Sequence, residues 1–124
     1  MTRKTDLGSL GEDLAVGYLV GLGYKVLFRN LFVGRGDEID IIALGRKGLL
    51  IFVEVKTMRI SGSSGLSPED NLTKRKLKKM YRSAEIFANE NPELLKNDIG
   101  YRLDLIAVSI DETGKSNFRH YENV

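Results

Sequence analysis

Cysteine is absent from this 124-residue sequence, and histidine occurs only once, at His120. The first absence excludes disulfide bonds, thiolate nucleophiles and cysteine-based zinc sites. The second excludes a metal site built from several histidines. Any metal must therefore be held by oxygen ligands, which favours hard cations such as Mg²⁺, Mn²⁺ or Ca²⁺.

Long apolar runs and a strong excess of one charge are also missing. No apolar run reaches the roughly 18 residues that a membrane-spanning helix needs. The polar N-terminal segment contains no secretory hydrophobic region. We therefore expect a cytoplasmic protein without a membrane partner. The formal net charge of +2 is too small to indicate a nucleic-acid partner, so the distribution of the cations matters more.

The composition that remains is typical of one globular domain. Hydrophobic residues make up 42% of the chain and charged residues 29%. We find no internal repeat and no second domain, so we expect a single domain over residues 1–124. Periodicity and turn signals predict a helix, three strands, a helix and two strands, over 7–22, 24–32, 37–43, 49–56, 74–89, 101–110 and 117–121. This order predicts an α/β fold, with helices packed on a mixed sheet of about five strands.

Charged residues inside strongly apolar strands are the most informative feature. Asp40 lies within the first apolar strand of the central pair, and Glu54 and Lys56 lie at the end of the second. Burying a charge is costly unless it is paired or binds a metal. These three residues therefore indicate a chemical site rather than ordinary core.

The turn between these two strands decides whether Asp40 meets Glu54. A three-residue loop over Arg46–Gly48 would pair them, whereas a loop of two or four residues would send them to opposite faces. Such loops favour a left-handed residue at their last position, and Gly48 provides it. We therefore predict the three-residue loop. It places two carboxylates opposite one another, which requires a cation or a proton between them.

This arrangement would suit metal-dependent hydrolysis. Asp40 and Glu54 can hold a hard divalent ion, and the backbone carbonyl of Val55 can add a ligand. A metal makes bound water easier to deprotonate and stabilises charge that develops on a phosphate. Lys56 shares a face with Glu54, where it can position the attacking water or help to deprotonate it.

Other charged residues have both a functional and a structural interpretation. Glu12 borders the apolar stripe of the first helix; it is a solvated carboxylate, or a further metal or water ligand if that helix packs across the sheet. Glu38 lies two residues before Asp40 on the same strand, so the two side chains share a face, and Glu38 is a reserve ligand. We expect Asp104 to form a structural ion pair with Arg102, and His120 to be an ordinary edge-strand residue.

The helix predicted over 74–89 is strongly basic on one side. It follows the flexible Ser/Gly-rich segment after the charged strand end, so phosphate contacts are a natural use of its cations. A solvated helix face is the alternative. The cations are Lys74, Arg75, Lys76, Lys78, Lys79 and Arg82, and beside a nuclease-like core they would contact DNA phosphates.

Several motifs in combination resemble a known family. They are Gly11-Glu12-Asp13-x-Ala15, Gly-Asp-Glu-Ile-Asp-Ile-Ile-Ala at 36–43, Val-Glu-Val-Lys at 53–56, Tyr-Arg-Leu-Asp-Leu-Ile at 101–106 and His-Tyr-Glu-Asn at 120–123. Over nearly the whole chain they look like the YraN-like uncharacterised bacterial family. That family is placed in the restriction-endonuclease-like superfamily with its PD-(D/E)xK core, and it is similar to archaeal Holliday-junction resolvases.

The resemblance implies a role for each matching residue. Asp40, Glu54 and Lys56 would form the nuclease signature, and Glu12 would match the helical acidic residue of the resolvases. Ile39 departs from the signature, because proline often stands before the first aspartate. The resemblance implies cleavage of DNA, branched or otherwise structured, with Mg²⁺ or Mn²⁺. It leaves a homodimer open, since resolvase-like enzymes commonly act as dimers.

Two other functions compete with the nuclease. A non-catalytic nucleic-acid-binding module on the same fold would bind DNA through the basic helix without metal-dependent turnover. A protein-interaction domain with a structural ion cluster would bind neither DNA nor divalent ions. Fold-level likeness does not decide between them, because function depends on the site.

Overall fold

The computed structural model describes residues 6–34, 37–60, 73–95 and 100–124. Its order of helices and strands is the predicted one, with boundaries that differ by up to three residues. The elements are α1 (Asp6–Gly21), β1 (Lys25–Val33), β2 (Asp37–Leu44), β3 (Leu50–Arg59), α2 (Lys74–Glu90), β4 (Tyr101–Ile110) and β5 (Ser116–Tyr121), with single-turn 3₁₀ helices at Arg46–Gly48 and Pro92–Leu94.

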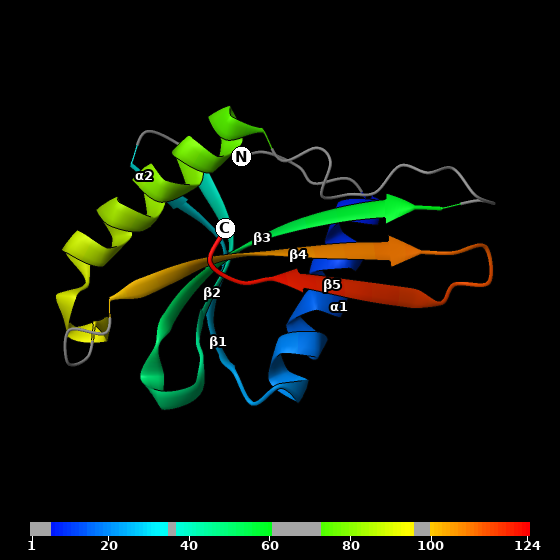
Figure 1. Ribbon diagram of the computed structural model, residues 1–124, viewed down its shortest axis with the longest axis horizontal. Coiled ribbons are helices and arrows are strands. Elements are labelled where there is room, and N and C mark those ends of the chain that lie inside the picture. Colours follow the sequence, from blue (N-terminus) through cyan, green and yellow to red (C-terminus); the bar gives the residue numbers. More distant parts are fainter. Residues whose placement is uncertain (1–5, 35–36, 61–72, 96–99) are drawn as a thin grey trace.

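The strands form one mixed sheet in the order β1-β2-β3-β4-β5. Neighbouring strands are antiparallel except β3 and β4, which are parallel. A parallel pair needs a crossover connection, and α2 lies on the connection between these two strands. Figure 1 shows the two helices on either side of the strands. The predicted α/β fold with a mixed five-stranded sheet is thus confirmed.

Each helix covers its own apolar cluster. Ala15 and Leu19 of α1 pack with residues of β2, β3 and β4, among them Ile41. Ala84 and Phe87 of α2 pack with a second set that includes Ile42, Leu50 and Phe52. Adjacent residues of β2 therefore enter different clusters, as strand alternation requires.

Alternation fails at the beginning of β2. Simple alternation predicts that Ile39 shares a face with Ile41, but Ile39 packs in the cluster under α2 while Ile41 packs under α1. Alternation is therefore broken between these two residues. On β1, Asn30 lies between the residues that pair with Ile41 and Ile39, and its backbone is left-handed with φ of +52°, which interrupts the regular alternation at this point.

The turn between β2 and β3 is the predicted three-residue loop. Leu44 pairs with Leu50, and the amide of Gly45 donates a hydrogen bond of 2.8 Å to the carbonyl of Leu49. Gly48 is left-handed with φ of +78°, as predicted. Lys47 is also left-handed, with φ of +64°, which sequence reasoning did not foresee. The register of the two strands is therefore the one that aligns Asp40 with Glu54.

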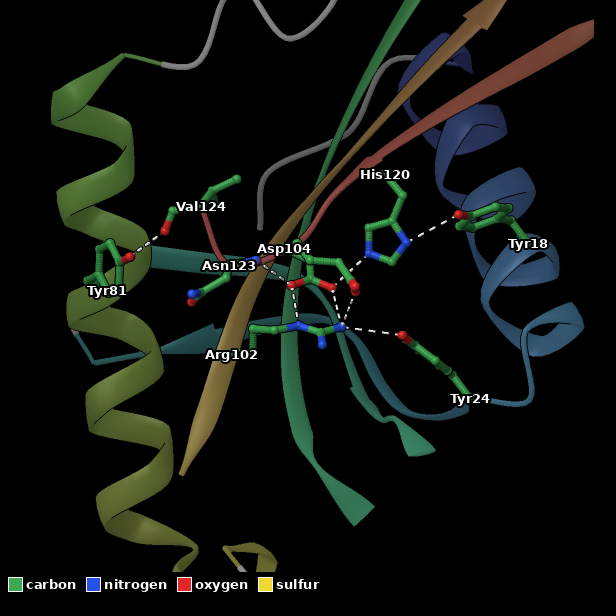
Figure 2. A network of polar contacts seen from close by, with 9 residues as sticks. Tyr18, Tyr24, Tyr81, Arg102, Asp104, His120, Asn123 and Val124 are labelled. Carbon is green, nitrogen blue, oxygen red and sulfur yellow. Dashed lines mark hydrogen bonds and ion pairs between the residues drawn. The ribbon is translucent and has the colours of Figure 1, made fainter. Parts of the chain in front are cut away.

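The helix α2 has a side-chain cap at its first turn. The hydroxyl of Thr73 accepts a hydrogen bond of 3.2 Å from the amide of Lys76. The helical period places Tyr81 near the apolar side of α2, but 44% of it is exposed. Its hydroxyl instead donates to the backbone carbonyl of Val124, at the last residue of the chain (Figure 2).

Asp104 is the centre of a buried polar network (Figure 2). Its side chain is fully buried, and both oxygens accept hydrogen bonds from Arg102, at 2.8 and 2.9 Å. The predicted ion pair is confirmed. The His120 ring nitrogen Nε2 lies 2.7 Å from the same carboxylate, and Nδ1 lies 3.2 Å from the Tyr18 hydroxyl. The expectation that His120 is an ordinary edge-strand residue is therefore wrong.

This network joins four parts of the fold. Asp104 and Arg102 belong to β4, His120 to β5 and Tyr18 to α1, and the amide of Asn123 donates to Asp104 at 3.1 Å. Burial by itself would raise the pKa of Asp104, but the hydrogen bonds from His120, Arg102 and Asn123 outweigh it and lower that pKa. The ionised carboxylate therefore stabilises the native state.

Among the described residues, no helix is both long and apolar enough to cross a membrane.

We expect Asp104→Asn to lower the free energy of unfolding by about 3 kcal/mol at pH 7, because it leaves buried donors without a charged partner. The folded pKa lies below the unfolded value, so this stabilisation is present above about pH 4 and is lost as the pH falls further. Urea denaturation at pH 7 and at pH 3 measures the difference between wild type and variant, which should shrink at pH 3.

Glu122→Gln is the control, since Glu122 is half exposed and lies 3.5 Å from the same Arg102 guanidinium. An exposed pair contributes at most about 1 kcal/mol. A loss in Glu122→Gln equal to that in Asp104→Asn would contradict the central role of Asp104.

Candidate active site

The site lies where β2 and β3 separate. Beyond the pair Ile41–Val53 the ladder stops, and the backbone amide of Val55 needs another acceptor, because buried amides are almost always paired. The Oδ2 atom of Asp40 accepts this hydrogen bond at 2.8 Å. The bond holds the Asp40 carboxylate at the fork of the sheet. Figure 1 shows β3 continuing beside β4 and β5, away from β2.

Three carboxylates gather at this fork. Glu12 of α1 and Glu38 and Asp40 of β2 each bring one oxygen to within 4.8 Å of the others. Glu12 is 2% exposed and Asp40 is 7% exposed, and Glu38 is partly buried. Buried carboxylates this close repel one another unless a proton or a cation lies among them. The donor set, all hard oxygens, fits a divalent ion such as Mg²⁺ or Mn²⁺.

Glu12 reaches the fork because α1 approaches β3 very closely. A Cβ atom added to Gly11 would lie 1.7 Å from the hydroxyl oxygen of Thr57, far inside contact distance. Only glycine permits this approach, and the next residue along the helix is Glu12. Sequence reasoning included Gly11 in a family motif but did not identify this packing role.

Glu54 and Lys56 form a pair beside the carboxylates. The Lys56 ammonium lies 3.3 Å from Oε1 of Glu54. Burial is the main cause that raises the pKa of Glu54 to about 7; the charge of Asp40 adds to the rise, and Lys56 opposes it. Glu54 is therefore close enough to interact with Asp40, although it is not one of the three carboxylates at the fork.

A cleft of about 240 Å³ connects this pair with the basic helix. Its lining includes Glu38 of β2, Glu54 of β3 and two cations of α2, Lys76 and Lys79. A hydrogen bond to Lys56, and the charge of Lys56, lower the pKa of Lys76. Burial alone would lower the pKa of Lys56 too, but the negative charges of Glu54 and Asp40 raise it. Lys56 of β3 and Lys76 of α2 therefore lie close enough to interact, and Lys76 also lines the cleft.

The other predicted phosphate-binding residues lie differently. Arg82 forms an ion pair with Asp37, with a nitrogen–oxygen distance of 2.7 Å. Lys74, Arg75 and Lys78 are exposed on α2 and do not line the cleft. The basic side of α2 thus divides into cations at the cleft and cations on the outer surface.

Sequence analysis gave Glu38 less weight as a candidate metal ligand than the structure does. It was only a reserve candidate, yet its carboxylate joins those of Glu12 and Asp40. The signal was present, because Glu38 and Asp40 are two residues apart on one strand. Val55 was expected to offer its carbonyl to a metal, and the structure shows its amide bonded to Asp40.

Comparison with known proteins extends over most of the chain. Residues 11–108 match the model of the uncharacterised protein family UPF0102. A UPF0102 protein of Trichlorobacter lovleyi is 38% identical over 117 residues, which cover 94% of this chain and 87% of that protein. A UPF0102 protein of Clostridium botulinum is 40% identical over 113 residues, which cover 91% and 86%.

One solved structure with a similar chain path is a repair endonuclease from Pyrococcus abyssi. The match has a TM-score of 0.46 and 12% sequence identity, and it covers 91% of this chain. It covers 42% of the endonuclease chain, so this chain spans less than half of that protein's length.

We expect Gly11→Ala to push α1 away from Thr57 and to displace Glu12, because the added methyl group has no room. The variant should lose about 1–3 kcal/mol of stability. Gly17→Ala is the matched control in the same helix, since a Cβ atom there meets nothing within 4 Å. It should gain roughly 0.5–1 kcal/mol through helix propensity. Thermal unfolding of both variants measures this, and equal shifts would contradict the close approach at Gly11.

Proposed function

Since this chain belongs to the uncharacterised protein family UPF0102, whose name states no activity, we propose a function from its cleft, namely divalent-metal-dependent hydrolysis of DNA phosphodiester bonds. The observation that carries the proposal is the group of three carboxylates, Glu12, Glu38 and Asp40, within 4.8 Å of one another at the fork of the sheet. This group lies beside a cleft whose lining includes two lysines. Acidic groups next to cations suit a phosphate substrate with a metal between them.

In this proposal the three carboxylates hold Mg²⁺ or Mn²⁺, with Glu54 and the carbonyl of Val55 as further candidate ligands. The hydrogen bond from the Val55 amide fixes one oxygen of Asp40, which presets the direction of the carboxylate. The ion would supply Lewis-acid stabilisation of negative charge on the phosphate.

Glu54 and Lys56 supply the proton chemistry. Hydrolysis requires water to lose a proton as its oxygen bonds to phosphorus, and the departing oxygen to gain one as its bond to phosphorus breaks. Glu54 interacts with both Asp40 and Lys56, so its carboxylate is placed to receive the proton from water. Lys56, 3.3 Å from Glu54, can orient the water or a phosphate oxygen.

The basic helix supplies the contacts to the DNA backbone. Lys76 and Lys79 line the cleft, where they can bind the phosphates nearest the carboxylates. Lys74, Arg75 and Lys78 are exposed further out and extend the positive surface. Backbone contacts of this kind weaken with rising salt, because bound phosphates release counterions.

The alternative is a DNA-binding module on the same fold without catalysis. It would use the same lysines and show the same salt dependence, so DNA binding alone does not separate the two functions. Turnover that depends on both a divalent ion and the carboxylates does separate them.

We expect Mn²⁺-dependent cutting of at least one substrate among branched, flapped and linear DNA. Asp40→Asn should reduce the rate about a hundredfold or more, while its amide oxygen still accepts the hydrogen bond from Val55, which preserves the fork. Gel assays with labelled DNA measure the rates. Glu85→Gln, an exposed carboxylate of α2, is the control and should cut like wild type.

Two results would overturn the nuclease. One is salt-sensitive binding of all three DNAs by the wild type without any cutting, which is the behaviour of the binding module. The other is cutting that Asp40→Asn leaves unchanged.

A further inference from the structure

Phe32 stands next to the acidic group. In the β1–β2 ladder it pairs directly with Glu38. Directly paired residues share a face of the sheet, with Cβ atoms about 4.5–5.5 Å apart. Glu38 belongs both to the group of three carboxylates and to the lining of the cleft. The Phe32 ring therefore lies beside the place where the proposed function puts the phosphate.

The ring is also open to a ligand. Phe32 is 44% exposed, and within the described residues it stacks on no other ring and joins neither apolar cluster. Phe28, on the same strand, is 43% exposed, but its ring packs 5.9 Å from that of Phe87. Single exposed aromatic residues are common on protein surfaces. The position of Phe32, rather than its exposure alone, is what indicates a function.

A flat apolar ring beside a phosphate site can bind a nucleobase. Each phosphate carries a nucleobase one sugar away, and every base has an aromatic face that stacks on such rings. In a continuous duplex these faces are covered by the neighbouring base pairs. Only an unpaired or extruded base offers its face to a side chain.

The charges around Phe32 favour the same ligand. Lys76 and Lys79 of α2 line the cleft that Glu38 also lines, so cations for the backbone lie near the residue with which Phe32 pairs. Because Phe32 pairs with Glu38, a base one sugar away from a phosphate at the carboxylates can reach the ring. Phe32 is exposed on the edge strand β1.

We propose that Phe32 stacks on an unpaired nucleobase next to the phosphate held at Glu12, Glu38 and Asp40, so that the substrate class is DNA with unpaired bases, such as single strands, flaps and branch points. The inference rests on the proposed function, because it uses the same cleft. It adds a specificity-determining residue on β1 and excludes continuous duplex as the preferred substrate.

The absence of tryptophan from the chain makes a direct test simple. Phe32→Trp introduces a single indole, whose emission is quenched when it stacks on a base. Phe28→Trp is the matched control, four residues earlier on β1 and about 13 Å away along the strand. DNA binding is followed in parallel by anisotropy of a labelled oligonucleotide, with Ca²⁺ as the cation.

A single-stranded oligonucleotide should quench Phe32→Trp saturably, and a duplex of equal length should quench it far less. Phe28→Trp should keep its emission with both. In the binding assay, Phe32→Ala should weaken affinity for the single strand about five- to a hundredfold, the range of one lost base–aromatic stack. Its affinity for duplex should stay unchanged, and Phe32→Tyr should restore single-strand binding.

The outcomes separate this inference from the proposed function. Binding by anisotropy without quenching of Phe32→Trp, or with equal quenching of Phe28→Trp, overturns the stacking role and leaves the nuclease standing. No binding of any DNA by the wild type overturns both. A Phe32→Ala variant that only lowers self-association in ultracentrifugation would place the ring in a contact between copies of the chain, and would also overturn the proposal.

Discussion

The hydrogen bond from the Val55 amide to the Asp40 carboxylate, 2.8 Å long, is what lets the sheet open. Two strands that separate in a buried region leave backbone groups without partners, and such groups cost free energy. Asp40 removes that cost at the first position after the ladder ends. The opening in turn lets Glu12 of α1 reach the carboxylates of β2, because Gly11 allows α1 to lie very close to β3. The cleft under α2 therefore depends on one side chain that is both structural and chemical.

The charged groups around the fork are arranged in layers. Carboxylates lie innermost, Glu54 and Lys56 form a pair beside them, and lysines of α2 line the outer wall of the cleft. Buried charges destabilise a fold unless they are compensated, so the rest of the molecule must be stable enough to keep them together. The network around Asp104 contributes to that stability, because it ties β4, β5 and α1 together through Arg102, His120 and Tyr18.

Local signals explain what the sequence could predict. Gly48 predicted the loop, and through it the register of β2 and β3, because only a left-handed residue suits that position. Motif combinations predicted the family, and the match over residues 11–108 confirms it. The contacts of His120 could not be read from local pattern, since its partners Asp104 and Tyr18 are 16 and 102 residues away. The change of face that carries Ile39 into the cluster under α2 likewise has no signature within β2, because the irregular residue, Asn30, lies on the neighbouring strand.

Mn²⁺ binding followed by electron paramagnetic resonance tests the central claim most directly, because it asks whether the carboxylates at the fork hold a divalent ion. The two variants to compare are Glu12→Gln and Asp13→Asn, at neighbouring residues of α1. Glu12 is buried at the fork, whereas Asp13 is exposed and pairs with Arg29 at 2.7 Å. The account predicts that wild type and Asp13→Asn bind Mn²⁺ alike and that Glu12→Gln binds it at least about tenfold more weakly. Equal binding by all three proteins, or no binding by the wild type, would contradict it.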